Sequence, residues 1–180
     1  MILEARQNAE FQYALTAPGR SPEIDAEADV YGWLMGSWEL NVRYYGVDVS
    51  ARGMKGEAHF EWVLEGRAVQ DTWIMPRLSE REAGLDGTMN MYGTTIRAWD
   101  PVIQAWRVTY INPVTGQRDE LIGRRSGKDV VQVGTHANGT PIRWIFSEIT
   151  QDSFRWTGEA LEPDGKNWKL EGEFAATRIR

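Results

Sequence analysis

Four side chains able to do chemistry stand at positions where the surrounding sequence alternates toward an apolar face: Asp71, Arg97, Tyr110 and Asp119. A buried charge is costly unless it is paired. We therefore expect Asp71, Arg97 and Asp119 either to meet one another or to contact water and a ligand. A structural ion pair between Asp71 and Arg97 in a filled interior is one interpretation. The other is an orienting polar cluster in an aromatic pocket, where Arg97 holds a carboxylate or enolate oxygen.

The same residues are candidates for catalysis. Asp71 or Asp119 could act as a general base, with Tyr110 as hydrogen-bond donor, if burial raises the pKa of the carboxylate. No motif in the sequence assigns this role, so the three residues are candidates only.

Tryptophan is the other unusual feature, with nine in 180 residues. This content predicts a wide, aromatic-lined interior in which some indoles are core and others form the walls of a pocket. The predicted ligand-binding residues, which share one face with Arg97, are Tyr44, Trp62, Trp73, Trp99, Trp106, Tyr110, Trp144 and Trp156.

Composition argues against several other functions. The chain has no cysteine and two histidines, with His59 on a charged face and His136 in or beside a turn. We therefore expect no metal site and no cofactor; a haem ligand would need one of these histidines to point inward. A net charge of -6 offers no basic patch for nucleic acid or an anionic membrane. No secretory signal or membrane-spanning stretch is evident, which predicts a cytoplasmic protein.

The elements that position these residues change character near residue 36. Helix formers run to Leu15, breakers fill 16–22, and 24–34 could form a second short helix. We expect residues 1–35 to pack as a helical and loop segment on a barrel formed by 36–180. From Trp38 onward apolar and polar residues alternate, as in strands with one buried and one solvated face.

Short hairpins fix the register of these strands. The turn signals pair Trp62 with Asp71, Trp99 with Trp106, Tyr110 with Asp119, Val133 with Trp144, and Gly158 with Leu170. A meander of this kind predicts an all-β fold, a single antiparallel up-and-down barrel of about 8–10 strands. A two-sheet sandwich is the alternative. The long connection 76–90 is either a lid over the barrel mouth or a solvated excursion.

Gly36-Ser37-Trp38, at the start of the first strand and behind a helical segment, resembles the G-x-W signature of the lipocalin and wider calycin superfamily. The resemblance implies that Trp38 closes one barrel end and that an arginine after the last strand, Arg178 or else Arg180, packs across its indole. With no cysteine pair, the chain looks most like bacterial lipocalin-like domains of unassigned function.

The resemblance also implies a cavity for a small hydrophobic or aromatic molecule, such as an acid, and this is the leading functional prediction. The alternative is an enzyme of isomerase, cyclase or decarboxylase type acting on such a molecule. The third is a non-catalytic oligomeric scaffold, for instance a homodimer. An exposed Trp33 or Trp168 would indicate such an interaction surface.

Overall fold

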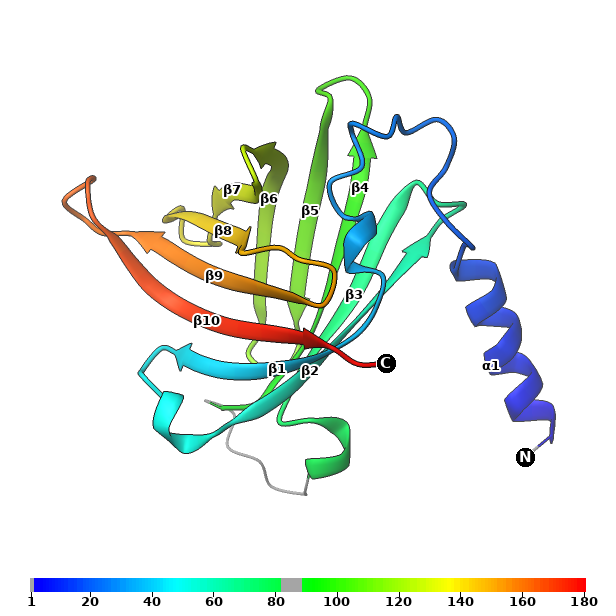
Figure 1. Cartoon of the computed structure of the whole chain (residues 1–180), viewed down its shortest axis with the longest axis horizontal. Helices are drawn as coiled ribbons and strands as arrows, with labels where there is room; N and C mark the ends of the chain where they lie inside the picture. The colour runs from blue at the N-terminus through cyan, green and yellow to red at the C-terminus, as the bar shows by residue number, and fades with distance from the viewer. Residues whose placement is uncertain (1, 82–88) are drawn as a thin grey trace.

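Ten antiparallel strands close into one barrel in the computed structural model, which describes residues 2–81 and 89–180, the side chains of 2–8 excepted (Figure 1). Each strand pairs with its neighbours in the chain, and β1 pairs with β10 to close the ring. The predicted up-and-down barrel is therefore confirmed, and the two-sheet sandwich is excluded.

The strands are β1 (Gly36–Tyr45), β2 (Lys55–Val63), β3 (Ala68–Met75), β4 (Met91–Asp100), β5 (Ala105–Asn112), β6 (Gln117–Ser126), β7 (Asp129–Thr135), β8 (Pro141–Ser147), β9 (Ser153–Leu161) and β10 (Trp168–Arg178). The helical elements are α1 (Ile2–Leu15) and three single 3-10 turns, η1 (Gly32–Leu34), η2 (Ser50–Arg52) and η3 (Leu78–Glu80).

Alternation in the sequence decides which side chains enter the barrel. In β1, Trp38, Leu40 and Val42 are buried, and the residues between them face outward. The predicted pairs Trp99 with Trp106 and Tyr110 with Asp119 are both confirmed. These hairpins have turns that the sequence marks clearly, at Pro101 and at Pro113.

The β2–β3 hairpin differs from its predicted register by two residues. Leu64, Glu65 and Gly66 all adopt positive φ, so the turn takes four residues and Val63 pairs with Ala68. Trp62 therefore faces Val69 rather than Asp71. Because a shift of two residues preserves the face of each side chain, Trp62 and Asp71 still point inward.

Strand β7 is displaced by one residue from the prediction, which reverses its faces. A two-residue turn at Gly127-Lys128 pairs Ser126 with Asp129. Gln132, not Val133, consequently lies opposite Trp144 and is fully buried, whereas Val133 is 50% exposed. The predicted pair of Val133 with Trp144 is wrong because the β7–β8 turn takes five residues, with Thr135 paired to Pro141.

Two β-bulges change faces elsewhere. One in β1, between Val42 and Tyr44, pairs Tyr45 with Gly172 on the inner face and Tyr44 with Glu173 on the outer face. The predicted inward position of Tyr44 is thus wrong.

A second bulge, in β10, lies between Leu170 and Gly172. Gly158 therefore pairs with Gly172 rather than with Leu170 as predicted. Trp168 pairs with Leu161 on the outer face, where the guanidinium of Arg143 lies 4.2 Å from its ring centroid.

The N-terminal segment closes one end of the barrel, called here the closed end. Ile24, Val30, Tyr31 and Leu34 are all buried there. In place of the predicted helix over 24–34 the chain forms turns followed by η1. The helix α1 projects beside the barrel (Figure 1), and its Phe11 is 69% exposed, so the packing expected for 1–35 is seen in the part after α1.

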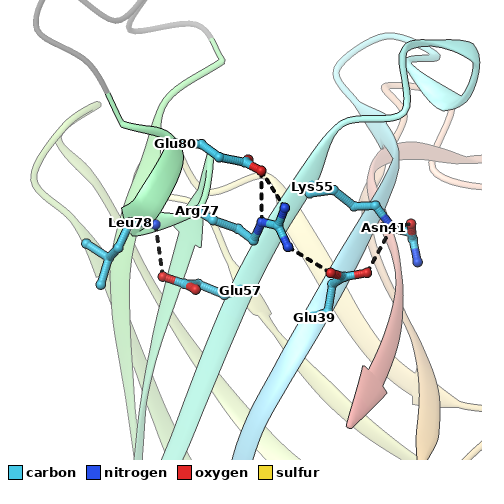
Figure 2. A network of polar contacts seen from close by, with 7 residues as sticks. All are labelled: Glu39, Asn41, Lys55, Glu57, Arg77, Leu78 and Glu80. Carbon is cyan, nitrogen blue, oxygen red and sulfur yellow. Dashed lines mark hydrogen bonds and ion pairs between the residues drawn. The ribbon is translucent and has the colours of Figure 1, made fainter. Parts of the chain in front are cut away.

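The β3–β4 connection begins on the outer face of β1 and β2 (Figure 2). Arg77 donates to Glu39 at 2.8 Å, and the backbone N–H of Leu78 donates to Glu57 at 3.0 Å. Lys55 also binds Glu39, at 2.9 Å. These contacts hold η3 against the barrel wall. The lid predicted over 76–90 includes residues 82–88, which lie outside the described residues.

Candidate functional site

A cavity of about 620 Å³ opens at the end of the barrel opposite the N-terminal segment, called here the open end. Its rim comes from the β1–β2, β5–β6 and β7–β8 turns and its walls from inward side chains of most strands. The aromatic lining residues are Tyr45, Trp73, Tyr110, Trp144, Trp156 and Phe174. An apolar cavity with a few polar groups is the usual form of a small-molecule site.

The floor of the cavity carries Arg97, which is 1% exposed. Its guanidinium forms an ion pair with Asp71, and its Nε donates to Gln132 Oε1 at 3.3 Å. Asp71 also accepts the backbone N–H of Thr95 at 2.8 Å. The two buried charges therefore meet, as the ion-pair interpretation predicted, and the pair has no net charge. Arg97 lines the cavity, whereas Asp71 is buried and does not line it.

The boundary beneath Arg97 is also polar. The Arg97 Cζ lies 5.2 Å from the ring centroid of Tyr31, a residue of the N-terminal segment. Tyr31 Oη and Gln132 Nε2 are buried without a hydrogen-bond partner among the described residues. Burial also raises the pKa of Tyr31, so its hydroxyl stays protonated. Neither Tyr31 nor Gln132 lines the cavity itself.

At the mouth, His136 bridges two carboxylates from different sides of the barrel. Its Nδ1 lies 2.7 Å from Asp119 of β6, and its Nε2 lies 3.0 Å from Glu171 of β10. Burial by itself lowers the pKa of His136, but the hydrogen bonds and charges of Asp119 and Glu171 outweigh it, and the net shift is upward. The imidazolium form is therefore favoured, donating one N–H to each carboxylate.

This position of His136 was not anticipated, since the sequence placed it in or beside a turn without directing it at the interior. It lines the cavity mouth, but both ring nitrogens are occupied by carboxylates. His59 faces outward and hydrogen-bonds Ser37 Oγ at 2.9 Å. Within the described residues, no three His, Cys, Asp or Glu side chains are grouped so as to hold a metal ion.

Tyr110 lines the cavity and packs over Gly93 of the neighbouring strand β4. A Cβ on Gly93 would approach its ring to 2.5 Å, so the glycine provides the space that the ring occupies. Burial raises the pKa of Tyr110, which keeps its hydroxyl a hydrogen-bond donor. Its partner on β6, Asp119, accepts from Gln117 Nε2 at 2.6 Å as well as from His136.

The predicted ligand-binding residues divide between the two ends of the barrel. The structure places Arg97, Trp73, Tyr110, Trp144 and Trp156 around the cavity. The other four predicted residues, Tyr44, Trp62, Trp99 and Trp106, do not line it.

The three tryptophans of that second group lie at the closed end. Trp106 packs against Trp62 and Trp99, with ring centroids 6.2 and 5.7 Å away, and donates its indole N–H to Ala28 O at 2.8 Å. They are core rather than cavity wall.

Several residues that line the cavity were not among the predicted ligand-binding residues. Tyr45 and Glu171 face the cavity because of the two bulges, for which the sequence gives no clear signal. Phe174 lies on a strand face that alternation identifies as inner, so its position could have been assigned to the site. Thr95, on the same face as Arg97, could likewise have been found.

The closed end has the geometry that the resemblance implied. Trp38 is fully buried, and the Arg178 guanidinium lies 4.1 Å from its ring centroid. Arg178 donates to Met35 O at 2.6 Å and to Trp33 O at 2.7 Å. Gly36 has φ 108°, which favours glycine at this position. Arg180 instead binds Asp152 at the surface.

Compared with known proteins, the sequence matches no family model and no curated protein. No described helix has the length and apolar character needed to cross a membrane.

Proposed function

We propose that this protein binds a small hydrophobic or aromatic molecule inside the open end of its barrel. One observation carries the proposal, namely an aromatic-walled cavity of about 620 Å³ that opens to solvent. Its volume falls in the range that ligand pockets occupy. Burial of a ligand's apolar surface against these rings supplies the driving force.

The polar groups support a ligand with at least one hydrogen-bond acceptor, of which a carboxylic acid is the example we favour. Arg97 at the floor and Tyr110 in the wall both line the cavity and can donate hydrogen bonds. The Asp71 partner offsets the charge of Arg97, so an acceptor is favoured mainly by hydrogen bonding and only secondarily by charge.

Tryptophan fluorescence tests the proposal directly, by titrating a panel of apolar acids and their neutral amides. Trp144→Phe alters a cavity wall, whereas Trp62→Phe alters a tryptophan of the closed end and serves as the matched control. We expect ligand-dependent quenching that Trp144→Phe reduces and Trp62→Phe does not. A panel that causes no spectral change, together with no heat in calorimetry, would contradict the proposal.

The enzyme alternative has weaker support. Asp71 is bound by Arg97 and by the Thr95 N–H, and Asp119 by His136 and Gln117. A general base needs an oxygen or nitrogen within reach of the substrate proton. Binding without chemistry is therefore the function we favour.

The lipocalin-like assignment is a separate proposal. Its support is the Trp38–Arg178 contact at the closed end of a barrel with up-and-down topology. A cytoplasmic location and a homodimer stay predictions. Trp33 gives the dimer no support, since its ring packs 5.4 Å from Phe154 and 6.2 Å from Trp38 in the closed end.

A further inference from the structure

Trp156 lies against the inner wall of the barrel across two glycines of neighbouring strands. Gly158 of β9 and Gly172 of β10 are direct partners in the sheet. A Cβ built on Gly158 would approach Trp156 Cη2 to 2.6 Å, and one on Gly172 would approach Cζ3 to 3.0 Å. The benzene ring of this indole therefore occupies the space that two side chains would fill.

The backbone does not require glycine at either position, because neither residue has a φ in the left-handed region. Any residue could adopt these strand conformations, and glycine in a strand is a cost in conformational entropy. What the two glycines provide is close approach of the indole to the wall.

Part of the Trp156 indole is turned to the cavity. Trp156 lines the cavity and is partly exposed, whereas Trp73, Trp144 and Phe174 around it are at most 6% exposed. Its inward position follows from its pairing with the buried Phe146 and Phe174. The exposed part of the indole consequently belongs to the cavity surface.

Among the described residues, no ring stacks on Trp156. The centroids of Trp73, Trp144 and Phe174 lie 5.4 to 5.7 Å away, and their planes are tilted by 48° to 59°. These three rings surround the Trp156 indole, and the four rings together are called here the aromatic box. An offset-stacked ring over the Trp156 indole would complete a favourable aromatic arrangement.

We propose that the cavity is specific for a planar aromatic ring system that stacks on Trp156, and that Gly158 and Gly172 set this specificity by holding the indole against the wall. The inference rests on the function proposed above and narrows its ligand class. A rigid ring system loses little conformational entropy on binding, unlike a flexible chain.

A quaternary ammonium ion is the other molecule that an aromatic box can hold. The charges around this box disfavour it. Arg97 presents a guanidinium at the floor, and the carboxylates of Asp119 and Glu171 are already bound to His136. A neutral or anionic ring system suits these surroundings better.

Two acids with equal numbers of carbon atoms test the inference, naphthalene-2-carboxylate and undecanoate. Their dissociation constants are measured by isothermal titration calorimetry, which does not depend on the fluorescence of the altered tryptophan. Because the linear chain is the more hydrophobic of the two, the readout is the ratio of the two constants and its change in each variant.

We expect Trp156→Leu to weaken naphthalene-2-carboxylate binding about tenfold, the size of an aromatic stacking contribution, and undecanoate binding less than twofold. Trp156→Phe should retain most of the affinity. Gly158→Ala, whose Cβ would displace the indole into the cavity, should weaken the planar acid about tenfold, and Gly172→Ala, whose Cβ contact is looser, should weaken it less. If one glycine variant does not fold, the other and Trp156→Leu still decide the matter.

Matched controls separate these effects from general damage. Gly19→Ala adds a Cβ that meets no atom within 4 Å, and Trp168→Leu removes an indole on the outer face. Neither should change the ratio. Circular dichroism and thermal unfolding establish that each variant is folded.

The outcomes distinguish the inference from the proposed function. Binding of undecanoate alone, or of both acids with a ratio that no Trp156 or glycine variant changes, overturns the planar specificity and leaves the binding function intact. Binding of neither acid counts against both. Tighter binding of tetrapropylammonium than of naphthalene-2-carboxylate would assign the box to a cation and overturn the inference.

Discussion

The two ends of this barrel use the same amino acid for opposite purposes. At the closed end, Trp33, Trp38 and Trp106 donate their indole N–H groups to backbone carbonyls of the N-terminal segment, at 2.7 to 2.9 Å. At the open end, Trp73, Trp144 and Trp156 surround a cavity, and none of them donates to a residue in 2–81 or 89–180.

Tryptophan content alone therefore does not determine whether one end of the barrel is a packed core or a pocket. A buried indole N–H needs an acceptor. Residues 28–34 bring such acceptors to one end, together with the rings of Tyr31 and Trp33. At the other end the indole N–H groups are left to water or to a ligand. The N-terminal segment therefore decides which end of the barrel is filled.

Truncating a tryptophan at each end should give the largest contrast in stability. Trp38→Ala should lower the free energy of unfolding by about 3–5 kcal/mol, because it leaves a cavity in a packed region and an unpaired carbonyl at Leu34. Trp156→Ala should cost less, about 1–2 kcal/mol, because that ring already borders an open cavity. Guanidinium denaturation measures both. Equal losses would contradict the division into a filled and a hollow end.

Arg97 lies at the boundary between the two ends, and its substitution tests whether the ion pair with Asp71 serves stability or binding. Arg97→Leu leaves Asp71 as an uncompensated buried charge and should cost about 3–5 kcal/mol. A double variant, Arg97→Leu with Asp71→Leu, removes both charges and should recover much of that loss. If Arg97→Leu changes stability while the affinity for naphthalene-2-carboxylate stays constant, the ion pair is structural and takes no part in binding.

Arg178→Met tests the cover on the closed end. It removes three hydrogen bonds from a guanidinium to backbone carbonyls and a cation–π contact with Trp38, and should cost about 2 kcal/mol. Arg180→Met, which breaks an exposed ion pair with Asp152, is the matched control and should cost less than about 0.5 kcal/mol. Thermal and chemical unfolding measure both. A larger effect at Arg180 would assign the covering role to the wrong arginine.

The smallest effect is expected at the mouth and depends on pH. Because the pKa of His136 is raised in the folded state, its contribution to stability is fully present below the unfolded value near 6.5 and is lost as pH rises through the folded value. Unfolding measured at a series of pH values should therefore show a decline above about pH 6.5 that His136→Gln removes. An unchanged pH profile in His136→Gln would show that the bridge from Asp119 to Glu171 does not contribute.

Local sequence signals predicted the fold well wherever a turn was short and marked. Proline turns fixed the β4–β5 and β5–β6 hairpins and with them Arg97, Tyr110 and Asp119. The β2–β3 turn was missed because two non-glycine residues, Leu64 and Glu65, adopt positive φ there. Such conformations are uncommon for these residues and are imposed by the surrounding structure.

The candidate site was harder to predict because a change of one residue in register reverses a strand. The tight turn before β7 places Gln132 inside the barrel, although glutamine is usually exposed. There its side-chain oxygen accepts a hydrogen bond from Arg97. The bulges that expose Tyr45 and Glu171 to the cavity depend on how β1 and β10 meet across the closure of the barrel. That contact joins residues far apart in the chain, so no local pattern reports it.

Because alternation and turn residues act locally, the antiparallel meander, the inner face of most strands and the burial of Trp38 follow from the sequence. Only the tertiary structure decided which tryptophans are core and which are wall, that His136 spans the mouth, and that Trp156 lies over two paired glycines. These depend on distances between strands brought together by closure of the barrel, and a linear pattern carries no information about the volume left inside.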